Sequence, residues 1–235
     1  MSHPANFQSP NRFLNVQTQE VYDALRPHLK VVNLKFGDIV ASTGEEVTHV
    51  YFPHIGVISL VVEMEIGDMI ETAMVGRDGV ANGTSALDGK VSLHKGIVQV
   101  EGAASIIDPN KLREIADEHS SFRALLIRHE QVVLAQAQQS AGCNASHTTE
   151  ARMCRWLLRI RDLTESDEMR LTQQYLAQML GVRRTSVSLI ANTLQKAGLI
   201  TYRRGVIRLV DLEALRASSC ECYERVQSHY RRLLS

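Results

Sequence analysis

The chain has 235 residues, enough for two small domains, and its 44% hydrophobic and 22% charged residues are typical of a soluble globular protein. No apolar run approaches the roughly 20 residues of a membrane-spanning helix, and the polar N-terminal segment lacks the apolar core of a secretory signal. We therefore expect a cytoplasmic protein without a membrane partner. The four cysteines all lie late in the chain, which is unlike a disulfide framework.

The charges are distributed unevenly, although the formal net charge is +0. Residues 1–144 hold 11 basic against 17 acidic side chains, whereas residues 145–235 hold 15 basic against 9 acidic ones. The segment 171–210 has six basic residues and no acidic residue. Such an asymmetry indicates that the C-terminal part binds a polyanion. The alternative is a chance excess of basic residues on a solvated face.

The first half of the chain predicts a short helix followed by a β-domain. Hydrophobic residues at helical spacing predict the helix over residues 11–30. Residues 31–107 alternate short β-rich runs with glycines, with a strand over 57–62 and a tight hairpin turn at Ile66–Met69. Many short strands with regular turns indicate a β-roll or a β-sandwich.

Two helices are predicted next, a short one from Pro109 to about His119 and a longer one from Ser121 to Gly142. The longer helix carries a heptad seam, which either faces its own domain or forms half of a coiled coil between two subunits. We favour a homodimer, because little of the helix's own domain is left for it to pack on. The predicted seam residues are Phe122, Leu125, His129, Val132, Val133 and Gln136. Residues 142–146 are the predicted hinge.

The segment 171–200 predicts a helix-turn-helix. Thr172 is placed to cap a first helix that ends at Leu180, and Gly181 allows a left-handed turn before a second helix over Arg184–Ala197. The predicted shared core contains Leu176, Ala177, Leu180, Val182, Val187, Ile190 and Leu194. Residues 199–210 then predict two short strands joined by an arginine-rich turn, which together form a wing.

Polar side chains of the second helix lie on the face that would enter a major groove. The predicted base-reading residues are Arg184, Thr185, Ser188 and Asn192. Contacts to the DNA backbone are predicted for Thr172, Arg183, Lys196, Arg203 and Arg204. A winged helix used for protein contacts would not need six basic residues without an acidic one. The sequence therefore predicts binding to double-stranded DNA.

At these residues the chain resembles the Crp/Fnr superfamily of bacterial transcription regulators, over nearly its whole length. The similarity includes Gly37–Val40, Val50–Phe52 and Gly56–Leu60, and it is strongest at Leu171–Ile200. The resemblance implies an α+β fold with an N-terminal β-roll of the cyclic-nucleotide-binding type, a long dimerisation helix and a C-terminal winged helix. It implies a homodimer on a palindromic operator, with RNA polymerase as a further candidate partner. The corresponding segments are 1–120, 121–144 and 145–235.

The sensor departs from the cyclic-nucleotide-binding members, whose phosphate cassette has a Gly-Glu pair and later an arginine beside Ser or Thr. Residues 76–79 here are Gly-Arg-Asp-Gly and residues 92–95 are Ser-Leu-His-Lys, with no glutamate between Glu71 and Glu101. The iron–sulfur members need a cysteine cluster near the N-terminus, but the first cysteine is Cys143. We therefore predict no cofactor and leave the effector of the β-roll unidentified.

Two other function classes stay open at this point: a ligand-binding or protein-interaction module with a degenerate winged helix, and a cupin-like metal enzyme. The enzyme is disfavoured, because His49, His54 and His94 are isolated in the sequence. We predict no enzyme activity, no catalytic residues and no metal site. Cys220 and Cys222 are predicted on one helix over 212–234, about 200° apart, and so unable to share a metal or a disulfide. A structural role is expected for all four cysteines, with a redox role as the alternative.

Overall fold

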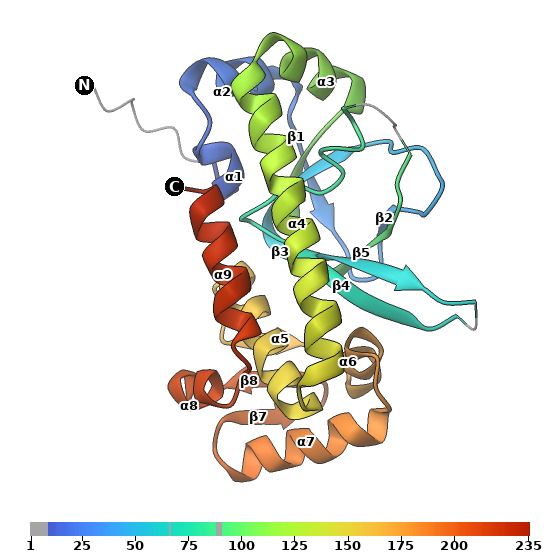
Figure 1. Ribbon diagram of the computed structural model, residues 1–235, viewed down its shortest axis with the longest axis vertical. Coiled ribbons are helices and arrows are strands. Elements are labelled where there is room, and N and C mark those ends of the chain that lie inside the picture. The colour runs from blue at the N-terminus through green and yellow to red at the C-terminus, as the bar shows by residue number, and fades with distance from the viewer. Residues whose placement is uncertain (1–8, 66, 88–90) are drawn as a thin grey trace. The chain divides into compact units, whose positions relative to one another are not determined.

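The computed structural model describes residues 9–65, 67–87 and 91–235 (Figure 1). The chain combines helices with an antiparallel sheet and a smaller second sheet, which confirms the predicted α+β class. It divides into two compact units. The first contains the described residues up to Leu60, together with Met74–Leu134 and His229–Ser235, and the second contains Val61–Ala73 and Ala135–Ser228. The predicted segments 1–120, 121–144 and 145–235 remain a proposal for the units that fold on their own.

The segment 11–30 forms three short elements and not the single predicted helix. These are α1 (Arg12–Asn15), α2 (Gln19–Leu25) and the 3-10 turn η1 (Arg26–His28). The side chain of Asn11 accepts a hydrogen bond from the Leu14 backbone N–H, and that of Thr18 accepts one from the Val21 N–H. Because each of these caps starts a helix, the segment has two helix N-termini.

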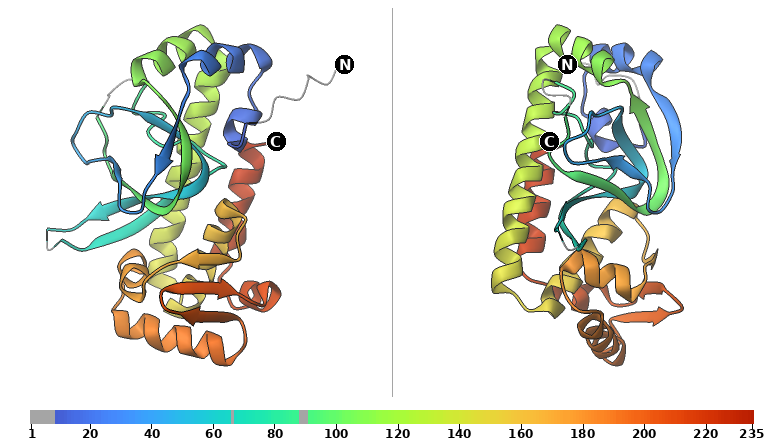
Figure 2. Two further views of the ribbon diagram at one scale, coloured as in Figure 1. Left: turned by 180° about the vertical axis from the view of Figure 1, so that it is seen from behind. Right: turned by 90° about the vertical axis from the view of Figure 1, so that its right-hand side faces the viewer.

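The larger sheet has the strand order β1-β5-β3-β4, with β2 also paired to β5. Its strands curl into the predicted β-roll (Figure 2). A Cβ at Gly102 would overlap the Ile55 carbonyl oxygen, so only glycine permits this approach of β5 to β3. The predicted strand 57–62 lies within β3, and Gly67, with a φ of +85°, lies in the turn after it. The bounds are β1 Lys30–Leu34, β2 Ile39–Ala41, β3 Val50–Glu63, β4 Met69–Val75 and β5 Lys95–Ile107.

Two helices follow the roll, α3 (Pro109–Glu118) and α4 (Ser120–Ser146). The predicted hinge at residues 142–146 is wrong, because α4 continues through all five of these residues. Gly142 alone weakens a helix by only about 1 kcal/mol relative to alanine. The break falls after Ser146, where the side chain of Thr148 accepts a hydrogen bond from the Ala151 backbone N–H and so starts the next helix.

The predicted seam of α4 faces its own chain, so its assignment to the dimer interface is corrected. Phe122, Leu125, His129, Val133 and Gln136 are buried and Val132 is half-buried. His129 Nε2 accepts a hydrogen bond from the Val80 backbone N–H at 3.2 Å, and a Cβ at Gly79 would overlap this ring nitrogen. The heptad spacing left two alternatives open, a seam that faces its own domain and a coiled coil between two subunits. These side chains agree with the first.

The second unit contains the remaining helices and a three-stranded antiparallel sheet with the order β6-β8-β7. The sequence did not predict β6, which is a three-residue strand. Trp156 and Leu157 are fully buried in this unit, as are Leu176 and Val187. The bounds are α5 Thr149–Thr164, β6 Glu168–Arg170, α6 Gln173–Leu180, α7 Arg184–Lys196, β7 Ile200–Arg203, β8 Val206–Leu209, α8 Leu212–Ala217 and α9 Cys222–Leu233.

The predicted C-terminal helix over 212–234 is broken into α8 and α9. Asp211 caps α8, whose C-cap is Ser218, and α9 begins only at Cys222. Cys220 therefore lies before the helix, and the 200° separation expected for two helical residues does not apply to it. Among the described residues, none of the helices combines the length and apolar character needed to cross a membrane.

Candidate nucleic-acid interface

The helix-turn-helix forms as the sequence predicted. The Thr172 hydroxyl accepts a hydrogen bond from the Tyr175 backbone N–H at 3.1 Å and caps α6. Gly181 ends α6 in the left-handed region, with a φ of +63°, which glycine adopts without strain. The predicted core residues Leu176, Ala177, Leu180, Val187 and Leu194 are buried, whereas Val182 and Ile190 are half-buried.

The outward face of α7 carries most of the predicted base-reading residues. Arg184, Thr185 and Asn192 are exposed. Leu189 lies on the same helix with 70% of its surface exposed, although it is apolar. Leu189 was not among the base-reading residues predicted from the sequence. The feature that could have identified it is its apolar character at a helix position outside the predicted core. An exposed apolar side chain on such a face is suited to contact the methyl group of a thymine.

Ser188 is the predicted reading residue that the structure places differently. Its hydroxyl donates a hydrogen bond to Gln173 Oε1 at 2.6 Å and also lies 3.1 Å from the Arg184 carbonyl oxygen. The side chain is half-buried between α7 and the first turn of α6. In this arrangement Ser188 links the two helices.

Two arginines stand at the N-terminus of α7, where a helix favours negative charge. Arg183 is the N-cap and makes no side-chain capping hydrogen bond, Arg184 is the first helical residue, and the first turn has no acidic residue. Cations at this end of a helix dipole cost about 0.3–1 kcal/mol each. An anion bound there would relieve the cost and gain the exposed N–H groups of the first turn.

The wing consists of β7 and β8, joined at Arg204 and Gly205. These two residues have φ values of +50° and +77°, the pattern of a type I′ hairpin turn, whose first position favours Asn, Asp or Gly. Arg204 is therefore in a backbone conformation that costs a non-glycine residue about 1–2 kcal/mol. Arg203 and Arg204 are both exposed, so their side chains are free to reach a DNA backbone, and their contacts to it stay a prediction.

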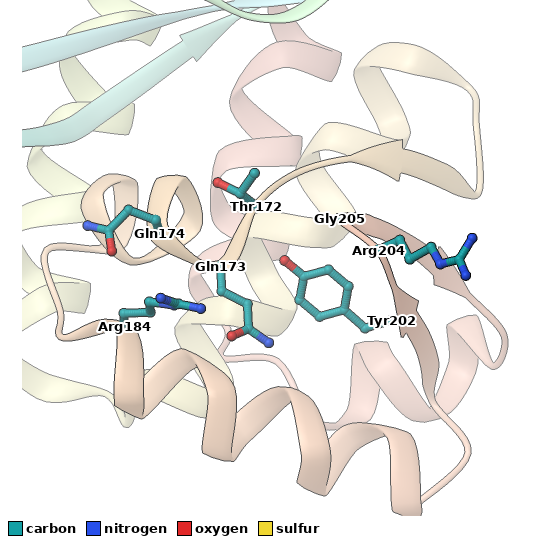
Figure 3. A pocket seen from close by; sticks show the side chains of 7 residues that line it. All are labelled: Thr172, Gln173, Gln174, Arg184, Tyr202, Arg204 and Gly205. Carbon is teal, nitrogen blue, oxygen red and sulfur yellow. The ribbon is translucent and has the colours of Figure 1, made fainter.

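A cleft of about 620 Å³ lies between the first turns of α6 and α7 and the wing (Figure 3). Figure 3 shows the Arg184 side chain extending toward Gln173, whereas Arg204 points away from the other labelled side chains. The Tyr202 hydroxyl donates a hydrogen bond to the Leu171 carbonyl oxygen at 2.7 Å. Burial raises the pKa of Tyr202, so the phenol keeps its proton. The lining residues are Thr172, Gln173, Gln174, Arg184, Tyr202, Arg204 and Gly205.

Three of these lining residues, Thr172, Arg184 and Arg204, were predicted from the sequence. Gln173, Gln174 and Tyr202 were missed. The two glutamines could have been predicted, because they directly follow the helix cap. No local feature of the sequence distinguishes Tyr202 from an ordinary strand residue. Gly205 was noted only as a turn residue.

The other predicted backbone-contacting residues lie outside this cleft. Arg183 lines a second cleft of about 410 Å³, formed by α6, the turn after it, Asp68 and the start of β4, and Lys196 is exposed in the last turn of α7. All six basic residues of the acid-free segment are exposed: Arg183, Arg184, Lys196, Arg203, Arg204 and Arg208. None of the six forms an ion pair with another residue in the described part of the chain. Their charge is available to a partner.

The comparison with protein families matches residues 151–218 to the Crp-like helix-turn-helix domain. Residues 151–218 therefore belong to the Crp-like helix-turn-helix family. This domain makes the protein a DNA-binding transcription regulator. The β-roll and the long helix have the fold of solved Crp/Fnr structures. Among curated proteins, no sequence matches the chain.

Several solved structures share the fold at low sequence identity. A putative Crp/Fnr-family transcriptional regulator from Eubacterium rectale is 14% identical, with a TM-score of 0.69 over 90% of this chain and 99% of its own. A CRP-family regulator from Thermus thermophilus is 20% identical, with a TM-score of 0.66 over 80% and 96%. A c-di-GMP-responsive global regulator from Xanthomonas campestris is 15% identical, with a TM-score of 0.65 over 83% and 100%. At these identities the likeness concerns the fold.

Proposed function

We propose that the regulator binds a two-fold palindromic operator as a homodimer and places the N-terminal part of α7 in the major groove of each half-site. The observation that carries the proposal is the set of six exposed, unpaired basic residues around the cleft, α7 and the wing. Three of them, Arg183, Arg184 and Arg204, occupy backbone positions that disfavour arginine in the free protein. Binding of a polyanion would relieve this local cost and so add to the free energy of binding.

Within this complex, Arg184 is proposed to read a guanine through its N7 and O6 atoms, the commonest specific contact of arginine. Thr185 and Asn192 are proposed to read neighbouring bases from the same face, and Leu189 to contact a thymine methyl. Ser188 is proposed to orient Gln173 and α6 in place of reading a base. Contacts to DNA phosphates are proposed for Thr172, Arg183, Lys196, Arg203 and Arg204.

The dimer is proposed to form through a face of α4 that the sequence did not select. We call this the exposed α4 face, formed by Ala124, Ile127, Gln131, Leu134 and Gln138, all of which are exposed. Their spacing alternates between three and four residues, which is the heptad pattern of a coiled coil. Ile127 and Leu134 leave 44% and 57% of their surfaces uncovered by the chain. A second copy of the same face would cover both.

Three further parts of the functional prediction are proposals as well. We propose that the protein acts in the cytoplasm and without catalysing a reaction. RNA polymerase is a candidate partner, because a regulator bound at a promoter has to affect transcription. The effector is proposed to be a small molecule other than cyclic AMP, bound by the β-roll.

The decisive experiment measures DNA binding as a function of salt concentration. The expected result is tight binding to one selected palindrome, with affinity that falls steeply as salt rises because phosphate contacts release counterions. Arg225, an exposed arginine of α9 outside the helix-turn-helix, provides the control variant Arg225→Ala, which should bind as the unmodified protein does. If a pool of random duplexes gives no binding at low salt, the proposal is wrong.

A further inference from the structure

Four side chains from two distant parts of the sequence meet in the second unit: Cys143, His147, Cys220 and Cys222. We call them the Cys3His cluster. Their three sulfur atoms and one ring nitrogen all lie within 4.8 Å of one another. The Sγ atoms of Cys143 and Cys220 are 3.5 Å apart, although 77 residues separate the two cysteines in the sequence.

The local structure explains how two segments bring these groups together. Cys143 lies in the last turns of α4, and His147 follows one turn later, held by a hydrogen bond from its backbone N–H to the Cys143 carbonyl oxygen at 3.1 Å. Residues four apart on a helix share a face. Cys220 lies in the turn before α9 and Cys222 is its first residue, so both sulfur atoms can face the same point.

The spacing matches a tetrahedral metal site. With Zn–S bonds of about 2.3 Å and Zn–N bonds of about 2.0–2.1 Å, neighbouring ligands of such a site lie roughly 3.5–4 Å apart. The Cys143–Cys220 sulfur pair is 3.5 Å apart, and Cys222 Sγ is 3.6 Å from His147 Nδ1. Closed sites of three cysteines and one histidine are a standard structural zinc set.

The histidine is held as a ligand would be. Its Nδ1 faces Cys222, whereas its Nε2 lies 3.1 Å from Glu221 Oε2. A carboxylate on the second ring nitrogen fixes the tautomer and the orientation of a metal-bound histidine. Gln139, one turn before Cys143 on α4, donates a hydrogen bond to Cys222 Sγ at 3.0 Å, as second-sphere groups do for metal-bound thiolates.

The surroundings favour a charged cluster over an ordinary apolar one. Cys143 and Cys222 are fully buried and Cys220 is 6% exposed, yet the only hydrophobic side chain packed against the three within the described residues is Ala151. The buried guanidinium groups of Arg152 and Arg155 interact electrostatically with Cys143. Three thiolates and one divalent ion carry a net charge of −1, which either of these two cations would offset.

We propose that Cys143, His147, Cys220 and Cys222 bind one thiolate-preferring divalent metal ion, of which Zn²⁺ is the first candidate, and that the ion ties the end of α4 to the start of α9. The three thiols would release their protons on binding. This proposal replaces the sequence-based prediction of no metal site, and it does not depend on the proposed DNA contacts.

The test uses the full-length protein, prepared metal-free under reducing conditions and titrated with Co²⁺. We expect one Co²⁺ per chain, with sulfur-to-cobalt charge-transfer bands and the intense visible bands of a tetrahedral site, and full displacement by Zn²⁺. Cys143→Ser and Cys222→Ser should lose the charge-transfer bands. Cys154→Ala is the matched control, because Cys154 is buried in α5 and is not part of the Cys3His cluster, and it should bind Co²⁺ unchanged.

A second variant keeps the proposal testable if the serine variants fail to fold. Glu221 is largely exposed, so Glu221→Gln should fold normally but weaken metal affinity about 10–100-fold, as loss of a second-sphere carboxylate does. The proposal is overturned if Co²⁺ gives no charge-transfer band. It is also overturned if the untreated protein contains a Cys143–Cys220 disulfide and no metal. Retained salt-dependent DNA binding in either case would leave the proposed function intact.

Discussion

The Ser188 hydroxyl of α7 donates a hydrogen bond to the side-chain oxygen of Gln173 on α6, 2.6 Å away. This bond joins the two helices of the helix-turn-helix next to the cleft. Ser188→Ala and Gln173→Ala should each lower the free energy of unfolding by about 0.5–1.5 kcal/mol, the usual net value of one hydrogen bond. Because both variants remove the same bond, the double variant should lose less than the sum. Urea denaturation measures all three, and strict additivity would show that the link carries no energy.

Arg184 is predicted to set the preference at one base pair of each half-site. It is exposed at the first position of α7 and extends into the cleft (Figure 3). Arg184→Ala should cost about 1–3 kcal/mol of binding free energy and relax the selection at that base pair. Selection of binding sites from random duplexes measures the change, with Arg225→Ala as the control. A selected motif identical to that of the unmodified protein would mean that another residue reads this base.

Arg204 is predicted to lower the stability of the free protein and to raise its affinity for DNA. Its left-handed backbone favours asparagine over arginine, so Arg204→Asn should raise the free energy of unfolding by up to about 1 kcal/mol. The same variant should weaken binding to all DNA sequences about equally and reduce the slope of log affinity against log salt by about 0.9. Thermal unfolding checks the change in stability, and salt titration of DNA binding checks the change in affinity. A more stable variant with unchanged DNA binding would remove Arg204 from the interface.

The exposed α4 face is predicted to hold the dimer. Leu134→Glu should raise the dimer dissociation constant at least about tenfold, or roughly 1.4 kcal/mol, because a two-fold axis brings like charges together. Val31→Glu is the control, since Val31 is 70% exposed and belongs to β1, not to α4. Light scattering at micromolar concentration separates monomers from dimers. A Leu134→Glu protein that stays dimeric would place the interface elsewhere.

Leu125 provides the complementary test of the corrected seam. It is 5% exposed and packs within its own chain, so Leu125→Ala should lower the free energy of unfolding by about 2–5 kcal/mol. Chemical denaturation, extrapolated at fixed protein concentration, measures the loss. The variant should nevertheless remain dimeric under native conditions. Dissociation without a loss of monomer stability would restore the original assignment.

Cyclic AMP is predicted not to bind the β-roll. Residues 76–79 lack the glutamate that would accept from a ribose hydroxyl, and the segment from Asp78 to Gly102 has no arginine to neutralise the phosphate. In addition, His129 already occupies the backbone N–H of Val80, beside Gly79. Calorimetry should detect no saturable heat up to millimolar cyclic AMP. Sub-millimolar binding would show that another set of residues replaces the missing contacts.

The helix-turn-helix could be predicted from the sequence because its signals are local. A capping threonine, a glycine in a left-handed turn and hydrophobic residues at helical spacing act within a few residues of one another. Thr172, Gly181 and the buried Leu176 therefore lie where the pattern placed them. The turn of the wing could also be predicted from the sequence, since the geometry of a hairpin turn depends on two adjacent residues.

The covered face of α4 and the cysteines that meet depend instead on contacts between distant parts of the chain. A heptad spacing fits two faces of one helix, and the choice depended on the contact of His129 with Gly79 and Val80, about 50 residues away in the sequence. The Cys3His cluster needed the break between α8 and α9 and the closure of a 77-residue span between Cys143 and Cys220. Such contacts depend on how the whole unit packs, and no local pattern encodes them.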